Sequence, residues 1–251
     1  MSGERHTAAA RTASYEADPE QVHRVLLLYS GGLDTSVMLK WIQDQYHAEV
    51  VCLTVNLGQP GEDYEVIRDK ALSLGALECH VVDARAEFAA EYLVPAIKAN
   101  ALYGDGYPLF TALGRPLIAK LAVEHARRSG CDTIAHGCTG KGNDQVRIEA
   151  TVATLAPELG VIAPVRSWQM GREEELAYAR EHGIPIKSHT PQGSEAAPYS
   201  IDDNLWGRSS EGRWIEDLGH APQDDVFQLV TPPEQAPEEP EHIELSFERG
   251  V

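Results

Sequence analysis

The sequence VLLLYSGGLDTS, residues 25–36, decides the fold of this chain. It begins with an apolar run of strand length and ends with residues that open an amphipathic helix, and two glycines separate these parts. Glycine allows a positive φ angle and lets an anion approach the backbone closely. The free N–H groups of a first helical turn point to the same place, where the helix dipole favours negative charge. The stretch therefore predicts a strand, a glycine loop and a helix around a phosphate-binding site.

Strand-like and helix-like segments alternate along most of the chain. We expect strands at residues 24–29, 49–55, 77–82, 133–136 and 161–165, and helices at residues 33–45, 62–74, 86–100, 113–128, 143–155 and 172–182, with a kink at Pro95. This alternation predicts an α/β fold, with a parallel twisted sheet of Rossmann-like type and helices on both faces. Ligands bind such sheets at the carboxyl ends of strands, so the loops after Tyr29, Val55 and His136 are the expected sites.

The two ends of the chain do not follow the alternation. Residues 1–23 are rich in Ala, Ser, Thr and Arg and contain no apolar core of a secretory signal, so we expect a disordered N-terminal extension. Residues 188–251 are rich in Pro, Gly, Ser and acidic residues, and only residues 242–247 have the alternation of a strand. We therefore expect one α/β domain at residues 24–187 and the start of a second, α+β domain at residues 188–251.

The composition excludes several classes of protein. Lys and Arg number 21 against 39 Asp and Glu, a net charge of -18 that argues against a nucleic-acid partner. No apolar run reaches the roughly 18 residues of a membrane helix. The four cysteines form no CxxC pair, and no Cys or His spacing predicts a structural metal site. We therefore expect structural thiols in a reducing, cytoplasmic compartment.

The glycine loop also carries side chains suited to a nucleotide. Ser30, Thr35 and Ser36 add hydroxyl donors to the backbone N–H groups. The carboxylate of Asp34 belongs in a phosphate-binding loop only beside a cation, and Mg²⁺ is the obvious one. The alternative is that Asp34 only caps a helix after a tight glycine turn. The pattern SGGxDTS between a strand and a helix is neither a Walker A motif nor GxGxxG.

A second glycine-rich loop, AHGCTGKGNDQVR at residues 135–147, also follows an expected strand and enters a helix. Asn143 and Arg147 are four residues apart on that helix and therefore lie on one face. A guanidinium group there can bind a carboxylate, and Asp144 can bind an ammonium group. The loop therefore predicts a pocket for an amino acid, and the alternative is a charged helix start exposed to water.

With both loops together, the sequence resembles argininosuccinate synthase, a family of the N-type ATP pyrophosphatases. SGGLDTS is similar to the pyrophosphate loop of that superfamily, and NDQVR at residues 143–147 is particular to this family within it. Further similar stretches lie at residues 56–59, 101–103, 115–119, 155–157, 161–164, 182–185 and 199–206. The resemblance implies a fold of the adenine nucleotide alpha hydrolase type, with nucleotide bound by residues 24–187. It also implies ligation of citrulline and aspartate to argininosuccinate in arginine biosynthesis, through a citrullyl-adenylate, with release of AMP and pyrophosphate.

The resemblance also implies roles for single residues. ATP would contact Leu28, Tyr29, Ser30, Gly31, Gly32, Leu33, Asp34, Thr35, Ser36, Val55 and Gly137. Aspartate would contact Thr139, Asn143 and Asp144, and citrulline would contact Tyr107, Asn143, Arg147, Ser200 and Ser209, with Thr111 retained beside Tyr107. No general base is evident, and Asp34, acting through Mg²⁺, is the best candidate for a catalytic role.

The sequence departs from the family in two ways. Val55 stands where the family usually has Ala, and Phe110 and Ala112 replace a small residue and a hydroxyl residue. Family members are also much longer and form homotetramers through a C-terminal helix that is absent here. We therefore expect a truncated synthetase domain at residues 188–251 and an incomplete citrulline pocket. Two alternatives follow: a short adenylating paralogue with a different substrate, or a non-catalytic nucleotide-binding module.

Overall fold

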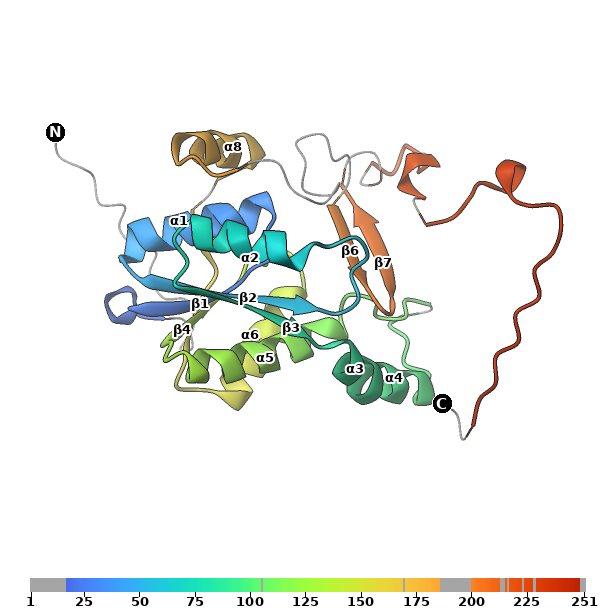
Figure 1. Cartoon of the computed structure of the whole chain (residues 1–251), viewed down its shortest axis with the longest axis horizontal. Helices are drawn as coiled ribbons and strands as arrows, with labels where there is room; N and C mark the ends of the chain where they lie inside the picture. The colour runs from blue at the N-terminus through green and yellow to red at the C-terminus, as the bar shows by residue number, and fades with distance from the viewer. Residues whose placement is uncertain are drawn as a thin grey trace.

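A five-stranded parallel sheet forms the centre of the molecule (Figure 1). The structure is a computed structural model that describes residues 17–104, 106–168, 170–185, 200–212, 215, 217–222, 224–227 and 229–248. The strands are β1 (Arg24–Leu28), β2 (Glu49–Asn56), β3 (Glu78–Asp83), β4 (Thr133–Ala135) and β5 (Gly160–Ile162), in the order β3-β2-β1-β4-β5. Leu26 of β1 lies opposite Val51 of β2 and Ile134 of β4, so β1 is the central strand. The expected parallel sheet is confirmed.

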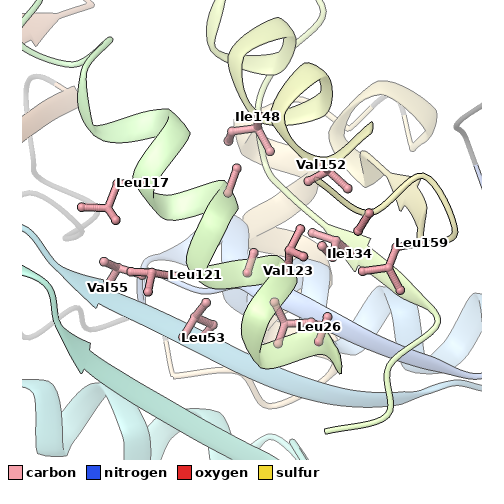
Figure 2. Close-up of a cluster of buried hydrophobic side chains, with 14 of the residues drawn as sticks. Leu26, Leu53, Val55, Leu117, Leu121, Val123, Ile134, Ile148, Val152 and Leu159 are labelled. Carbon is pink, nitrogen blue, oxygen red and sulfur yellow. The ribbon is translucent and has the colours of Figure 1, made fainter. Parts of the chain in front are cut away.

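Helices cover both faces of this sheet, as the alternation predicts. One face carries α1 (Leu33–Tyr46), α2 (Tyr64–Ser73) and α8 (Arg172–Glu181), and the other carries α5 (Gly114–Arg128) and α6 (Asp144–Leu155) (Figure 1). Val25 and Leu27 pack with the core that includes α1 and α2. Leu26 and Leu53 pack with Leu117, Val123 and Val152 of the core under α5 and α6 (Figure 2). Both faces of the central strands β1 and β2 are therefore buried, which explains their apolar sequences.

The helix expected at residues 86–100 is divided into three parts. α3 (Arg85–Glu87) leads into a π-helical segment, η2 (Phe88–Leu93), and then into α4 (Val94–Lys98). Pro95 lies at the start of α4 and has no N–H to donate to the preceding turn. The irregularity expected at Pro95 therefore takes the form of a wider turn before it.

The expected strand at residues 161–165 is wrong at its end. β5 stops at Ile162, and the next residues form the short helix α7 (Pro164–Ser167). Proline is favoured in the first turn of a helix because its φ angle is already helical and its missing N–H would be unbonded there. Pro164 therefore begins a helix where the sequence pattern alone suggested more strand.

The disordered extension expected at residues 1–23 falls mostly outside the described residues, which begin at residue 17. The last part of that expectation needs correction, because residues 17–23 are folded onto the sheet. A 3-10 helix, η1 (Pro19–Gln21), is capped by the Asp18 carboxylate, which accepts from the N–H of Glu20 at 3.2 Å. Val22 is buried, and the N–H of Ala17 donates to the carbonyl of Val161 at 3.0 Å.

A β-hairpin that the sequence reading missed follows the sheet domain. β6 (Ser200–Asn204) and β7 (Gly207–Glu211) form an antiparallel pair beside the sheet (Figure 1). The strand expected at residues 242–247 is wrong, because this segment has no strand partner in the described part of the chain and its apolar side chains are exposed. Alternating apolar residues stabilise a strand only where one face can be buried. The expected domain boundary at residues 187 and 188 lies outside the described residues.

Among the described helices, we find none with the run of apolar residues that a bilayer crossing requires.

Candidate functional site

A cavity of about 470 Å³ lies at the carboxyl ends of β1, β2 and β4. The chain runs outward from β1 to β3 and then returns to the other side of β1, so the sheet order reverses between β1 and β4. This is the position at which open α/β sheets bind ligands. Six of the residues predicted to contact a nucleotide line the cavity: Leu28, Tyr29, Ser30, Thr35, Val55 and Gly137.

The glycine loop between β1 and α1 forms one part of the cavity wall. Gly31 has a φ angle of +79°, in the left-handed region, and a Cβ atom there would lie 2.9 Å from the Cγ1 of Ile67. Both the conformation and the space therefore require glycine. The hydroxyls of Ser30 and Thr35 lie 3.2 Å apart and both residues line the cavity, so two hydroxyl donors flank the loop.

Other residues predicted in this loop support it without lining the cavity. The hydroxyl of Ser36 is fully buried and donates to the carbonyl of Gly32 at 2.6 Å, while the Tyr29 hydroxyl lies 3.0 Å from it. Leu33 is part of the buried core. Asp34 is exposed in the first turn of α1 and is not among the cavity-lining residues. The hydroxyl of Ser36 therefore holds the backbone of the loop.

Lys70 of α2 contacts the same loop from the side that faces this helix. We did not predict this residue from the sequence. Its Nζ donates to the carbonyl of Gly31 at 2.8 Å, and the side chain is buried. Burial lowers the pKa of Lys70 from its ordinary value of 10.5 to about 8. One signal could have identified it: Lys70 interrupts the apolar face that Ile67, Ala71 and Leu74 form at helical spacing.

The second glycine loop is held by a buried ion network. The Nε2 of His136 lies 3.0 Å from Oε1 of Glu149, and both side chains are buried. The N–H of Cys138 donates to Nδ1 of His136 at 3.2 Å, so Nδ1 is an acceptor and Nε2 carries the proton toward Glu149. His136 and Cys138 line the cavity beside Gly137. Burial raises the pKa of the Cys138 thiol to about 11.

Two further side chains connect this network to the tip of the loop. Nη2 of Arg166 lies 2.8 Å from Oε1 of Glu149, and Nη1 of Arg166 donates to Oε1 of Gln145 at 2.8 Å. The amide of Gln145 in turn donates to the carbonyls of Gly140 and Gly142, at 2.9 and 3.2 Å. These contacts could not be predicted from the sequence, because the residues that form them are up to 30 positions apart.

The start of α6 brings together the charged residues predicted to bind amino acids. Nη1 of Arg147 donates to Oδ1 of Asp144 at 2.5 Å, and Nε of Arg115 donates to Oδ2 of the same carboxylate at 2.8 Å. Arg115 also forms an ion pair with Asp202 of β6. Burial alone would raise the pKa of Asp144, but the two guanidinium groups outweigh it and lower the pKa below 3.8. Arg115 lines the cavity and was not predicted as a site residue.

The hairpin closes one side of the cavity with Ile201, Asp202, Asp203 and Glu211. The N–H of Leu205 donates to the carbonyl of Leu57 at 2.8 Å, and the amide of Asn204 donates to the carbonyl of Phe110 at 2.7 Å. The ring of Phe110 leaves no room for a Cβ atom at Gly207, where the nearest ring carbon would be 2.4 Å away. Phe110, which departs from the family pattern, therefore packs against the turn of the hairpin.

The remaining predicted substrate residues lie around this arrangement and do not line the cavity. The hydroxyls of Tyr107 and Thr111 lie 3.2 Å apart in the segment before α5. Ser209 lies opposite Asp202 in the hairpin, and Ser200 lies opposite Glu211. Thr139 and Asn143 are exposed around the start of α6. Arg115 therefore links two of these groups, the α6 residues and the hairpin.

Four acidic side chains lie on the cavity wall away from the glycine loop. Glu62, Asp202, Asp203 and Glu211 all line the cavity, and Oε2 of Glu62 is buried without a hydrogen-bond partner in the structure. Burial raises the pKa of Glu62, and the nearby charge of Asp203 raises it further. No three His, Cys, Asp or Glu side chains in the described residues are arranged to hold a metal ion by themselves. The cavity therefore combines a glycine loop suited to an anion with four carboxylates, of which Asp202 and Asp203 are already paired with Arg115 and Arg208.

Comparisons with known proteins identify similar sequences. The Arginosuccinate synthase N-terminal HUP domain family matches residues 24–185, and the Arginosuccinate synthase C-terminal domain family matches residues 199–251. Curated relatives include argininosuccinate synthase of Rubrobacter xylanophilus, 59% identical over 228 residues, and of Symbiobacterium thermophilum, 52% identical over 228 residues. These alignments cover 91% of this chain but 54% and 56% of the relatives, so the chain spans about half the length of the curated relatives it matches.

Among solved structures, a 4-thiouridine synthetase–RNA complex with bound ATP aligns with 71% of this chain and 47% of that chain, at 17% identity and a TM-score of 0.47.

Proposed function

Because the chain belongs to the argininosuccinate synthase family, we propose that it acts in the ATP-dependent ligation of citrulline and aspartate to argininosuccinate. The products would be argininosuccinate, AMP and pyrophosphate, and the reaction would serve arginine biosynthesis. One structural observation supports this activity in addition to the family membership. Two glycine loops, after β1 and after β4, line a single cavity at the point where the sheet order reverses.

The nucleotide would lie between these loops. Its phosphates would meet the backbone of Gly31 and Gly32 and the hydroxyls of Ser30 and Thr35, because the α1 N-terminus is there and favours negative charge. Leu28, Tyr29 and Val55 at the strand ends and Gly137 on the second loop would contact the rest of the nucleotide. The buried position of Leu33 and Ser36 supports an indirect role for these two residues.

The amino acids would bind where α6 begins and the hairpin meets it. Aspartate would contact Thr139, Asn143 and Asp144. Citrulline would contact Tyr107, Asn143, Arg147, Ser200 and Ser209, and Thr111, whose hydroxyl lies 3.2 Å from that of Tyr107, would also contact a substrate. The Arg115 contacts with Asp144 and Asp202 support this assignment, because they hold a charged cluster at the edge of the nucleotide cavity.

The chemistry that we propose has two steps. The ureido oxygen of citrulline attacks the α-phosphorus of ATP, so that pyrophosphate leaves and a citrullyl-adenylate forms. The amine of aspartate then attacks the activated carbon, and AMP leaves with the oxygen. Orientation of the reactants and stabilisation of charge supply most of the catalysis in such transfers. The two loops and the charged cluster are suited to this work, since each holds polar groups near the carboxyl ends of the strands.

Magnesium would accompany the nucleotide. Mg²⁺ prefers oxygen ligands and is usually held by one or two carboxylates together with substrate phosphates. The carboxylates beside the cavity and Asp34 in the first turn of α1 supply such oxygens, so the residues present fit this ion. Bound there, it would neutralise charge on the leaving pyrophosphate. We also propose a cytoplasmic location, which the four free cysteines support.

An assay of pyrophosphate release tests the proposal. The 251-residue chain would be incubated with ATP and Mg²⁺, with citrulline and aspartate added singly or together. Steady release that requires both amino acids is the expected result. Release with a different acceptor would instead indicate an adenylating paralogue. Binding of ATP without any turnover would contradict the proposed activity and indicate a nucleotide-binding module.

A further inference from the structure

The glycine loop rests on two residues of α2 that are three positions apart. Ile67 fills the space under Gly31, where a Cβ atom would come within 2.9 Å of its side chain. Lys70 donates to the carbonyl of Gly31 at 2.8 Å, and only 7% of the residue is exposed. One turn of α2 therefore fixes both the position of Gly31 and the direction of its carbonyl.

The direction of this carbonyl determines where the next N–H points. In a trans peptide the C=O and the following N–H point in opposite directions. Because the carbonyl of Gly31 points down to Lys70, the N–H of Gly32 points away from α2. That N–H donates to Oγ of Ser30 at 3.3 Å, and Ser30 lines the cavity. The contact to Lys70 thus keeps the Gly32 N–H, together with the Ser30 hydroxyl that accepts from it, on the side where an anion would bind.

Without the Lys70 contact, the peptide between Gly31 and Gly32 could rotate. A peptide between two glycines can rotate at little cost, because both positive and negative φ angles are open to each residue. A rotated peptide would present a carbonyl oxygen, and hence negative charge, to the cavity. A buried ammonium group opposes that rotation, because hydrogen bonds from charged donors are stronger than those from neutral ones. Its positive charge behind the loop also favours an anion in front of it.

We propose that Lys70 is a positioning residue that orients the Gly31–Gly32 peptide for binding the pyrophosphate part of ATP. The proposal rests on the proposed function, since it assumes that the phosphates meet this loop. It assigns Lys70 no contact with the nucleotide. Its effect is confined to ligands with a polyphosphate, and the nucleoside part of the site does not depend on it.

Calorimetric titration of three ligands tests this inference. Lys70→Met keeps the length of the apolar stem and removes the ammonium group, and Lys98→Met removes a charge from an exposed site on α4. Each variant and the wild type would be titrated with Mg-pyrophosphate, Mg-ATP and adenosine. Lys70→Met should bind pyrophosphate and ATP about tenfold more weakly or worse, with adenosine affinity unchanged within twofold. Lys98→Met should match the wild type for all three ligands.

The outcomes distinguish a wrong role for Lys70 from a wrong proposed function. Failure of the wild type to bind ATP or pyrophosphate would overturn the proposed function itself. Wild-type binding with equal affinity in Lys70→Met would overturn only the role of Lys70, as would an equal loss for adenosine and pyrophosphate. Thermal unfolding would check that Lys70→Met is folded. If it is not, Lys70→Gln, which keeps a neutral donor, should bind pyrophosphate more weakly than the wild type and still bind adenosine.

Discussion

The Nε2 atom of His136 lies 3.0 Å from Oε1 of Glu149, and the two side chains are 1% and 5% exposed. This contact joins the end of β4 to the middle of α6, and Arg166 adds a second contact to the same carboxylate. A buried charge of this kind is tolerated only when it is paired and hydrogen-bonded. The network therefore fixes the second glycine loop to the body of the fold.

Replacing Glu149 by Leu should destabilise the chain strongly. The change keeps the volume of the side chain but leaves Arg166 and His136 beside an apolar group, and removal of one partner from a buried ion pair costs about 3–5 kcal/mol. Urea unfolding followed by circular dichroism measures this. Glu158→Leu is the control, because Glu158 pairs with Arg127 on the exposed surface, and its unfolding midpoint should hardly change. Equal midpoints for the two variants would contradict a stabilising role for the buried network.

Arg115→Lys should loosen the hairpin. Arg115 contacts Asp144 and Asp202 at once, and a lysine, with a single point of charge, cannot bridge two carboxylates in this geometry. Hydrogen exchange measured by mass spectrometry should show exchange in residues 200–211 faster by about tenfold, the equivalent of one lost charge-assisted hydrogen bond. Exchange in β1 and β2 serves as the internal reference and should stay slow. Unchanged exchange in the hairpin would mean that its docking depends on Leu205 and Asn204 alone.

Asp34→Asn should reduce steady pyrophosphate release by about 100-fold or more, because a metal ion at the phosphates is worth several kcal/mol to the transition state. The amide is a poorer ligand for Mg²⁺ and carries no charge. Asp69→Asn, an exposed change on α2, is the matched control and should retain full activity. Wild-type turnover in Asp34→Asn would contradict a catalytic role for Asp34, which is not the N-cap of α1 either, because Gly32 holds that position.

Arg147→Ala should raise the KM for citrulline while leaving the affinity for ATP within about twofold, because a lost bidentate carboxylate contact costs about 1.5–3 kcal/mol. Arg147 contacts Asp144 and does not line the nucleotide cavity, so the two effects can be separated. Arg128→Ala at the far, exposed end of α5 controls for loss of a positive charge. A parallel loss of ATP affinity would place Arg147 in the nucleotide site instead.

The contribution of Lys70 to the free energy of unfolding should become more favourable at alkaline pH. Its pKa is about 8 when folded and 10.5 as its ordinary value, so between these limits the unfolded chain binds more protons than the folded one. The penalty for burying the ammonium is therefore present below pH 8 and disappears as the pH rises toward 10.5. The free energy of unfolding of the wild type, measured against Lys70→Met, should rise by about 1–3 kcal/mol from pH 7.5 to pH 10. A constant difference between the two proteins would contradict the burial of a charged Lys70.

Most of the sheet and its helices could be predicted because parallel strands are buried on both faces. The runs at residues 25–29 and 50–53 are continuous apolar segments, and the intervening helices have clear apolar stripes. The hairpin could not be predicted in this way. Its strands read SIDDN and GRSSE, and they are held by a salt bridge to Arg115 and by turn contacts to Leu57 and Phe110. The strand expected at residues 242–247 had the apolar pattern but has no partner in the described residues.

The parts of the candidate site that are formed by residues close together in the sequence could be predicted. The two glycine motifs mark the ends of β1 and β4, and both line the cavity. Lys70, Arg115 and Glu149 were missed because each acts on a residue that is distant in the sequence, such as Gly31 for Lys70. Spacing along the chain shows which residues share a face of one helix. It does not show which buried charge meets which loop from another element.

The contact between Leu205 and Gly58 couples the hairpin to the loop after β2. Gly58 has a φ angle of +95°, and the Leu205 side chain occupies the place that a Cβ atom would take. A larger residue at either position would separate the hairpin from the loop after β2, and the pocket would lose its acidic wall with the sheet still intact. Substitutions at Gly58 and Leu205 should therefore occur together among related sequences. A sheet domain separated from the hairpin would keep the glycine loop that is suited to phosphate, but it would lose the hairpin residues that we propose bind the amino-acid substrates.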